Sequence, residues 1–144
     1  VLLRMAGGAR GVLFASQIAV GEENGLRLRV YGERGGLSWE QQNPNELRMS
    51  WPDRPVELVR TGGATLGIAA GNATRLPAGH PEGFLEAFAN VYRGFAEAVG
   101  AVPNGQRLND YPDIADGLRG MRFVEAVVAS SAAGGLWTTL VRDS

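Results

Sequence analysis

Residues 1–60 alternate between hydrophobic and polar positions with the period of two that is typical of β-strands. The clearest example is residues 26–31, in which leucine and valine alternate with arginine and tyrosine. Turns rich in Gly, Asn and Pro separate the segments, and a parallel return would need a crossover of about a dozen residues. We therefore predict an antiparallel meander, with strands over residues 1–6, 10–20, 26–31, 37–40, 47–51 and 56–60.

Residues 61–79 break this pattern. They are rich in Gly, Ala and Thr and show neither a strand period nor a helix period. Connections of this length without secondary structure are usually functional or disordered. A long loop is expected here, acting as a flap or as a contact to a partner.

The next segment has the period of an amphipathic helix. Pro81 is expected at the first helical position, and Gly100 is expected to end the helix. The apolar face of this helix is formed by Phe84, Phe88, Val91, Tyr92, Phe95 and Val99.

A second helix is predicted after Asp113, which is expected to cap it, with Asp116 three residues later. Gly134 and Gly135 are expected to end it, and residues 136–141 are expected to form a last strand. The element order predicts an α+β fold with an open, predominantly antiparallel β-sheet and helices packed on one face.

Length and composition exclude several classes of function. The 144 residues fit one domain, residues 1–144, which is long enough to bury roughly 70% of its unfolded surface in a self-sufficient core. The formal net charge is -1 and the 14 basic residues form no run, so no nucleic acid and no membrane surface is expected as a partner. The sequence shows no membrane span and no signal peptide, so a soluble protein with a cytoplasmic location by default is expected.

Two features suggest that catalysis depends on residues outside this chain. The chain contains neither cysteine nor lysine, which removes thiolate and lysine chemistry. It also starts at Val1 and runs directly into an apolar segment, which we interpret as the start of a strand in a fragment of a longer protein.

The glycine-rich segments do not predict a nucleotide site. Residues 7–11 and 32–36 both lack the G-x-G-x-x-G spacing, and neither opens a helix, so both are predicted to be turns. No catalytic, cofactor-binding or metal-binding residue is assigned to the chain.

His80 is the single histidine and allows two interpretations. With Glu82 and Glu86 it could supply metal ligands or move a proton, or it could simply start the following helix. Glu23 and Asn24 are similarly open, because carboxylate and amide groups bind sugar hydroxyls but are also common at a solvated hairpin tip.

Several motifs occur together in an order that is more specific than any one of them. The sequence reads GGARG at 7–11, LRVYGERGGL at 28–37, HPEGFLEAF at 80–88 and DGL at 116–118. Over nearly the whole chain it resembles the C-terminal domain of the glucose-fructose oxidoreductase, inositol dehydrogenase and rhizopine catabolism (Gfo/Idh/MocA) family.

This resemblance implies a two-domain enzyme. Its N-terminal Rossmann domain, absent here, would hold NAD or NADP, and its C-terminal α+β domain would carry substrate contacts and form a homo-oligomer through the sheet face. The family's Glu-Lys-Pro and Asp-x-x-x-His motifs are missing from this sequence. By position the resemblance implies that Gln17, Glu23, Asn24 and His80 contact substrate, although Glu23 stands where relatives often have an aromatic residue.

Three functions are compatible with the sequence. The first is the substrate-side domain of an NAD(P)-dependent oxidoreductase that acts on a sugar, a polyol or a related secondary alcohol, with no cofactor bound by this chain itself. The second is a non-catalytic assembly module without a ligand, and the third is an independent metal- or sugar-binding domain around His80.

Overall fold

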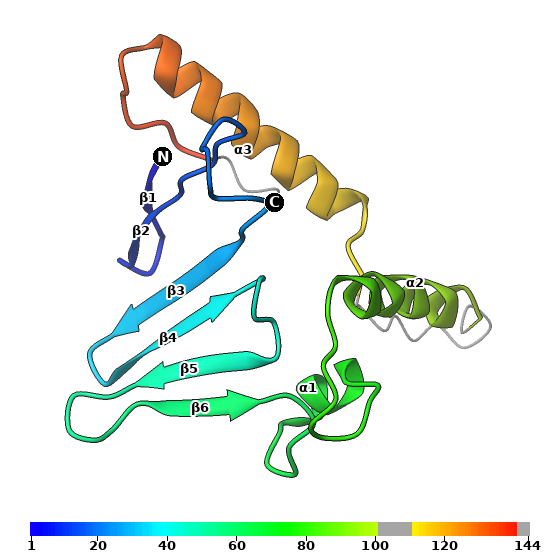
Figure 1. Ribbon diagram of the computed structural model, residues 1–144. Helices are drawn as coiled ribbons and strands as arrows, with labels where there is room; N and C mark the ends of the chain where they lie inside the picture. Colours follow the sequence, from blue (N-terminus) through cyan, green and yellow to red (C-terminus); the bar gives the residue numbers. More distant parts are fainter. Residues whose placement is uncertain (101–110, 141–144) are drawn as a thin grey trace. The chain divides into compact units, whose positions relative to one another are not determined.

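The computed structural model describes residues 1–100 and 111–140. These residues fall into two compact units. The hairpin-helix unit contains residues 1–19 and 111–140, and the sheet unit contains residues 20–100. Figure 1 shows the elements of both units in chain order.

The hairpin-helix unit begins with a short antiparallel hairpin. β1 (Leu2–Arg4) pairs with β2 (Arg10–Val12), and Leu3 lies opposite Gly11. The predicted strand over residues 10–20 is too long, because only its first three residues are β-strand. The pairing ends where Leu13 and Val1 exchange hydrogen bonds of 2.9 and 2.8 Å, and residues 14–19 have no strand opposite them within this unit.

Helix α3 (Ile114–Ala132) begins and ends at the predicted residues. The carboxylate of Asp113 accepts hydrogen bonds from the N–H groups of Ala115 and Asp116, and Asp116 accepts from the N–H of Asp113. This reciprocal pair is a capping box. At the other end Gly134 and Gly135 both have positive φ, and their N–H groups bond to the carbonyls of Ser131 and Ser130.

The segment after α3 differs from the prediction. Residues 136–140 are not β-strand, and residue 141 lies outside the described residues. The segment is held by side chains instead: Ser130 Oγ donates to the carbonyl of Leu136 at 2.7 Å. The Arg4 guanidinium also lies 4.1 Å from the centre of the Trp137 ring. Residues 136–140 therefore have the composition of a strand but do not pair as one.

The sheet unit contains a four-stranded antiparallel meander. Its strands are β3 (Arg27–Gly32), β4 (Gly35–Glu40), β5 (Glu46–Ser50) and β6 (Glu57–Arg60), and they lie side by side in chain order. These four strands confirm the later part of the predicted meander, whereas the first hairpin forms a separate two-stranded sheet. The antiparallel sheets and the helices together confirm the α+β fold class.

The register divides this sheet into an apolar face and a polar face. One cross-strand row of the apolar face consists of Leu28, Trp39, Leu47 and Val59, and the next contains Val30, Leu37 and Met49. The polar face carries the row Arg29, Ser38, Arg48 and Leu58 and the row Tyr31, Gly36 and Ser50. Residues opposite each other share a face, so the alternation of β3, β4 and β5 is realised across the sheet, whereas β6 places Glu57 on the apolar face and Leu58 on the polar face.

Two helices follow the meander in the sheet unit. α1 (Ile68–Ala73) is a short helix inside the stretch predicted to be a loop, and its lack of apolar periodicity explains why the sequence did not indicate it. α2 (Phe84–Gly100) starts three residues after Pro81, so Pro81 is not its first helical residue. In Figure 1 both helices lie beyond the end of the sheet at which β4 and β6 end and β5 begins.

The expected self-sufficient hydrophobic core is not present among the described residues. None of their hydrophobic side chains is buried, and Gly94 of α2 is their one buried residue. Within each unit the extensive contacts are between paired strands, so the apolar faces of the sheet and of the helices remain exposed. No helix in residues 1–100 and 111–140 is long and apolar enough to cross a membrane.

Candidate functional site

The four predicted substrate contacts are divided between the two units. Gln17 belongs to the hairpin-helix unit, whereas Glu23, Asn24 and His80 belong to the sheet unit. Gln17 is exposed and lies in the segment after β2, within a turn in which Ser16 Oγ accepts a hydrogen bond from the N–H of Ile18.

Glu23 and Asn24 occupy a tight turn that is held on both sides. The N–H of Gly25 donates to the carbonyl of Glu22. Glu23 has a φ of 48°, a left-handed backbone conformation that residues other than glycine rarely adopt. The Glu22 carboxylate pairs with Arg27 at 2.9 Å, and the carbonyl of Asn24 accepts from Gln41 Nε2 at 3.0 Å.

This turn leaves two polar side chains free. Among the described residues the carboxylate of Glu23 and the side-chain amide of Asn24 have no hydrogen-bond or ion-pair partner, and both are exposed. A fixed backbone with free polar tips suits recognition of a hydroxylated ligand, because little main-chain freedom is lost on binding.

His80 is placed by the last turn of the segment between α1 and α2. Its ring Nδ1 lies 3.1 Å from the carbonyl oxygen of Pro77, and Gly79 before it has φ of 87°. Because a carbonyl can only accept, Nδ1 carries the proton in this contact. Nε2 is the ring nitrogen left for a ligand, and the residue is exposed.

Glu82 anchors the segment that carries His80. Its Oε1 accepts hydrogen bonds from the N–H groups of Arg75 and Leu76 at 2.8 and 2.7 Å. Through this one oxygen the carboxylate closes residues 75–82 into a loop.

Glu86 is also engaged by the backbone. Its Oε2 accepts from the N–H of Gly83 at 2.8 Å, at the start of α2. This hydrogen bond lowers the pKa of Glu86 below its ordinary value of 4.5, and the nearby Arg75 acts in the same direction. Among the described residues no group of three or more His, Asp or Glu side chains could hold a metal ion.

Asn45, in the turn between β4 and β5, connects the loop to the sheet. Its side-chain amide donates to the carbonyl of Glu82 and accepts from the N–H of Glu82, at 2.8 and 2.9 Å. The hydroxyl of Thr61, after β6, donates to the side-chain oxygen of Asn45 at 3.0 Å. The sequence indicated only a turn at Asn45 and gave no signal of this role.

The segment around α1 is attached to α2 by a second polar contact. Asn90 of α2 accepts from Arg75 Nε at 2.9 Å and donates to the carbonyl of Ala73 at 2.7 Å. His80 therefore lies on a segment that is tied to both the sheet and α2. No hydrogen bond or ion pair of the described residues joins His80 to Glu23 or Asn24.

Comparison with known proteins identifies the family. Residues 1–140 match the family model described as oxidoreductase family, C-terminal alpha/beta domain, which is the C-terminal domain of Gfo/Idh/MocA proteins. The chain belongs to the Gfo/Idh/MocA family.

Solved structures of this family superpose closely on the chain. An oxidoreductase from Sinorhizobium meliloti is 45% identical with a TM-score of 0.85, over 96% of this chain and 39% of that protein. An inositol dehydrogenase homolog from Azotobacter vinelandii, complexed with NADH and myo-inositol, is 38% identical with a TM-score of 0.89, over 95% of this chain and 37% of that protein.

A curated relative gives the same result at the level of sequence. The uncharacterized oxidoreductase YfiI of Bacillus subtilis (strain 168) is 35% identical over 141 residues, which are 95% of this chain and 36% of that protein. The chain thus spans little more than a third of the length of these Gfo/Idh/MocA relatives.

The strand topology tests whether a dinucleotide fits this part of a Gfo/Idh/MocA protein. Dinucleotides are usually bound where a parallel strand meets a helix through a glycine-rich turn. Every strand pair among residues 1–100 and 111–140 is antiparallel and joined directly by a turn or loop. The described residues therefore do not fit a site of that kind.

Proposed function

We propose that this chain is the substrate-side domain of a two-domain, NAD(P)-dependent dehydrogenase that oxidises a polyol, a sugar or a related secondary alcohol. The observation that carries the proposal is the likeness to an inositol dehydrogenase homolog complexed with NADH and myo-inositol. The family match over residues 1–140 supports an oxidoreductase as the parent protein.

The proposed substrate contacts are Gln17, Glu23, Asn24 and His80. A polyol presents hydroxyl groups that both donate and accept hydrogen bonds, and these side chains offer both functions. Glu23 supplies an acceptor, the amides of Gln17 and Asn24 supply donors and acceptors, and the exposed His80 offers its Nε2. Their exposure leaves them accessible to a ligand.

The nicotinamide is proposed to be held outside this chain, since the described strands do not provide the usual dinucleotide unit. When bound, the cofactor takes the hydride from the substrate carbon, and the residues of this chain orient the substrate hydroxyls. This chain alone would then not catalyse the reaction. A cytoplasmic location remains our expectation for the full protein.

The site proposal is tested in the full-length enzyme. We expect N24A, E23A, Q17A and H80A each to raise KM for myo-inositol or a related polyol by about tenfold, as for the loss of one charged or well-placed hydrogen bond. The matched control is E33A, which removes an exposed carboxylate in the turn between β3 and β4. Kinetics of the four variants that equal those of E33A would contradict the assignment.

A failure of substrate chemistry is a separate outcome. If the full-length enzyme reduces neither NAD nor NADP with any polyol or sugar tested, the proposed activity is wrong whatever the variants do. Enzyme assays with both nicotinamides and a panel of polyols provide this measurement.

An assembly role is a second candidate, and the apolar face of the sheet favours it. Leu28 and Val30 on this face are 57% and 61% exposed, and apolar surface of this extent commonly marks an interface. We propose a homo-oligomer formed through this face. V30D places a charge on this face and should lower the mass of the oligomer in solution, measured by light scattering, whereas the control R34D should not. Equal masses of the two variants would count against the interface.

A further inference from the structure

The polar face of the four-stranded sheet contains a groove that runs along β4. Its volume is about 470 Å³, and it is lined by residues of β3, β4, β5 and the following turn. The groove exists because β4 carries the small residues Gly36 and Ser38 on this face, between the longer side chains Tyr31 and Arg48 of the neighbouring strands.

Two arginines face each other across this groove. Arg29 on β3 and Arg48 on β5 both lie opposite Ser38, so they flank β4 in one cross-strand row. Adjacent strands are about 4.8 Å apart, which places the two backbones about 10 Å from each other. Side chains as long as arginine span half of that distance, so both guanidinium groups can reach a ligand above Ser38.

Neither guanidinium is neutralised by the protein. Among the described residues Arg29 and Arg48 have no ion pair and no side-chain hydrogen bond. The neighbouring row on the same face differs, because Arg27 pairs with Glu40 and Arg60 pairs with Glu46, at 3.8 and 3.4 Å. The carboxylates of this face are thus already engaged with other arginines.

The remaining lining also favours a negatively charged ligand. Hydroxyl groups of Tyr31, Ser38 and Ser50 border the groove, and no aspartate or glutamate is among its described lining residues. Two unpaired cations close to each other repel, and an oxyanion between them relieves this repulsion. The planar guanidinium also matches the geometry of carboxylate and phosphate groups.

We propose that Arg29 and Arg48 form a binding site for a small organic anion that carries a phosphate or carboxylate group. The hydroxyls of Ser38 and Tyr31 donate to the same oxyanion. The site lies on the polar face, whereas the assembly proposed above uses the apolar face, so the two proposals are independent.

The experiment titrates the full-length protein with inorganic phosphate and with succinate in a calorimeter, at constant ionic strength maintained with chloride. We expect at least one probe to bind saturably. R29Q and R48Q should each weaken this binding about tenfold. Phosphate binding alone would indicate a phosphoryl ligand, and succinate binding would indicate a carboxylate ligand.

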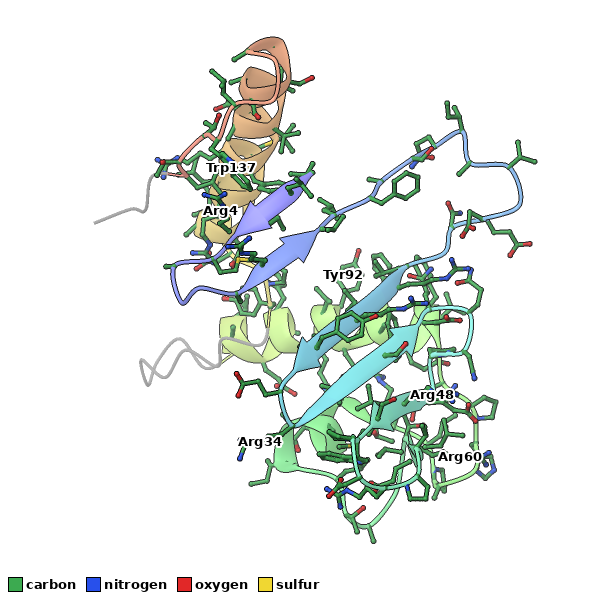
Figure 2. The ribbon with its side chains drawn as sticks, turned by 90° about the vertical axis from the view of Figure 1, so that its left-hand side faces the viewer. Arg4, Arg34, Arg48, Arg60, Tyr92 and Trp137 are labelled. Carbon is green, nitrogen blue, oxygen red and sulfur yellow. The ribbon has the colours of Figure 1, made fainter. Side chains whose placement is uncertain are left out.

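The matched control is R34Q. Arg34 lies in the turn between β3 and β4, has no described ion pair, and is not among the lining residues of the groove. Figure 2 shows Arg34 and Arg48 well separated on the sheet unit. R34Q removes the same charge, and it should bind the probes as the unmodified protein does.

Two results would overturn the proposal. The first is that neither probe binds, or that R29Q, R48Q and R34Q weaken binding equally, which would mean non-specific attraction. The second is that R29Q and R48Q lower the solution mass while the unmodified protein binds no probe. In that case the oxyanion comes from a carboxylate of a second copy rather than from a small ligand.

Discussion

Helices α2 and α3 start in different ways, and the difference shows what local sequence can specify. The start of α3 is closed by two side chains within its first turn, Asp113 and Asp116. The start of α2 has only half of such an arrangement, because Gly83 has no side chain and Glu86 alone reaches back to it. The residue before it, Glu82, is instead held by Asn45, which is 37 positions away in the sequence.

The largest expected effect concerns the long-range link. N45A removes two hydrogen bonds to Glu82 and one from Thr61, and leaves part-buried groups without partners. We expect the free energy of unfolding to fall by about 2–3 kcal/mol, measured by urea unfolding followed through Trp39 and Trp51. The proton exchange of the Glu82 amide should accelerate as well.

The control for this change is N43A in the same turn. Asn43 makes a single exposed side-chain hydrogen bond, to Glu46 at 2.8 Å, so its loss should cost less than about 1 kcal/mol. If N43A and N45A destabilise the protein equally, the start of α2 does not depend on the Asn45 link.

The same distinction explains which parts of the fold were predictable. Apolar and polar residues alternate in β3, β4 and β5, and each of the strands β3 to β6 pairs with its neighbour in sequence, so the pattern and the turn residues were sufficient. The capping box and the final glycines of α3 are likewise local signals. Residues 13–20 and 136–140 have strand-like patterns, but a pattern does not supply the partner that a strand needs.

The candidate site was predictable only in part. The turn at Glu23 and Asn24 followed from residue types, and the junction at His80 followed from the change in period. The role of Asn45 and the engagement of the Glu82 carboxylate depend on contacts between distant residues, which no spacing reveals. The groove beside Arg29 and Arg48 depends on the register of three strands, and that register is a property of the sheet.

A smaller effect is expected from the local cap of α3. D113A removes the acceptor for the N–H groups of Ala115 and Asp116, and loss of such a cap typically costs about 1 kcal/mol. D113N is the matched control, because asparagine caps about as well as aspartate. Faster amide exchange at Ala115 and Asp116 in D113A but not in D113N would confirm that the cap acts locally, and equal effects of both variants would contradict it.

The smallest expected effect is a dependence on pH, and it compares the two helix starts directly. The N–H of Asp113 lowers the pKa of Asp116 below its ordinary value of 3.8, as the N–H of Gly83 does for Glu86 from 4.5. A carboxyl with a lowered pKa in the folded state stabilises the protein at pH values above its unfolded pKa. That stabilisation is lost as the pH falls through the folded pKa, when the carboxylate is protonated in both states.

The variants E86Q and D116N isolate these two contributions. The difference in unfolding free energy between the unmodified protein and E86Q should be constant near neutral pH and should shrink below the ordinary pKa of glutamate, 4.5. For D116N the decrease should begin at lower pH, below 3.8. Urea unfolding over a pH series measures both differences, and a difference that grows as the pH falls would show that the carboxylate is not stabilised at the helix start.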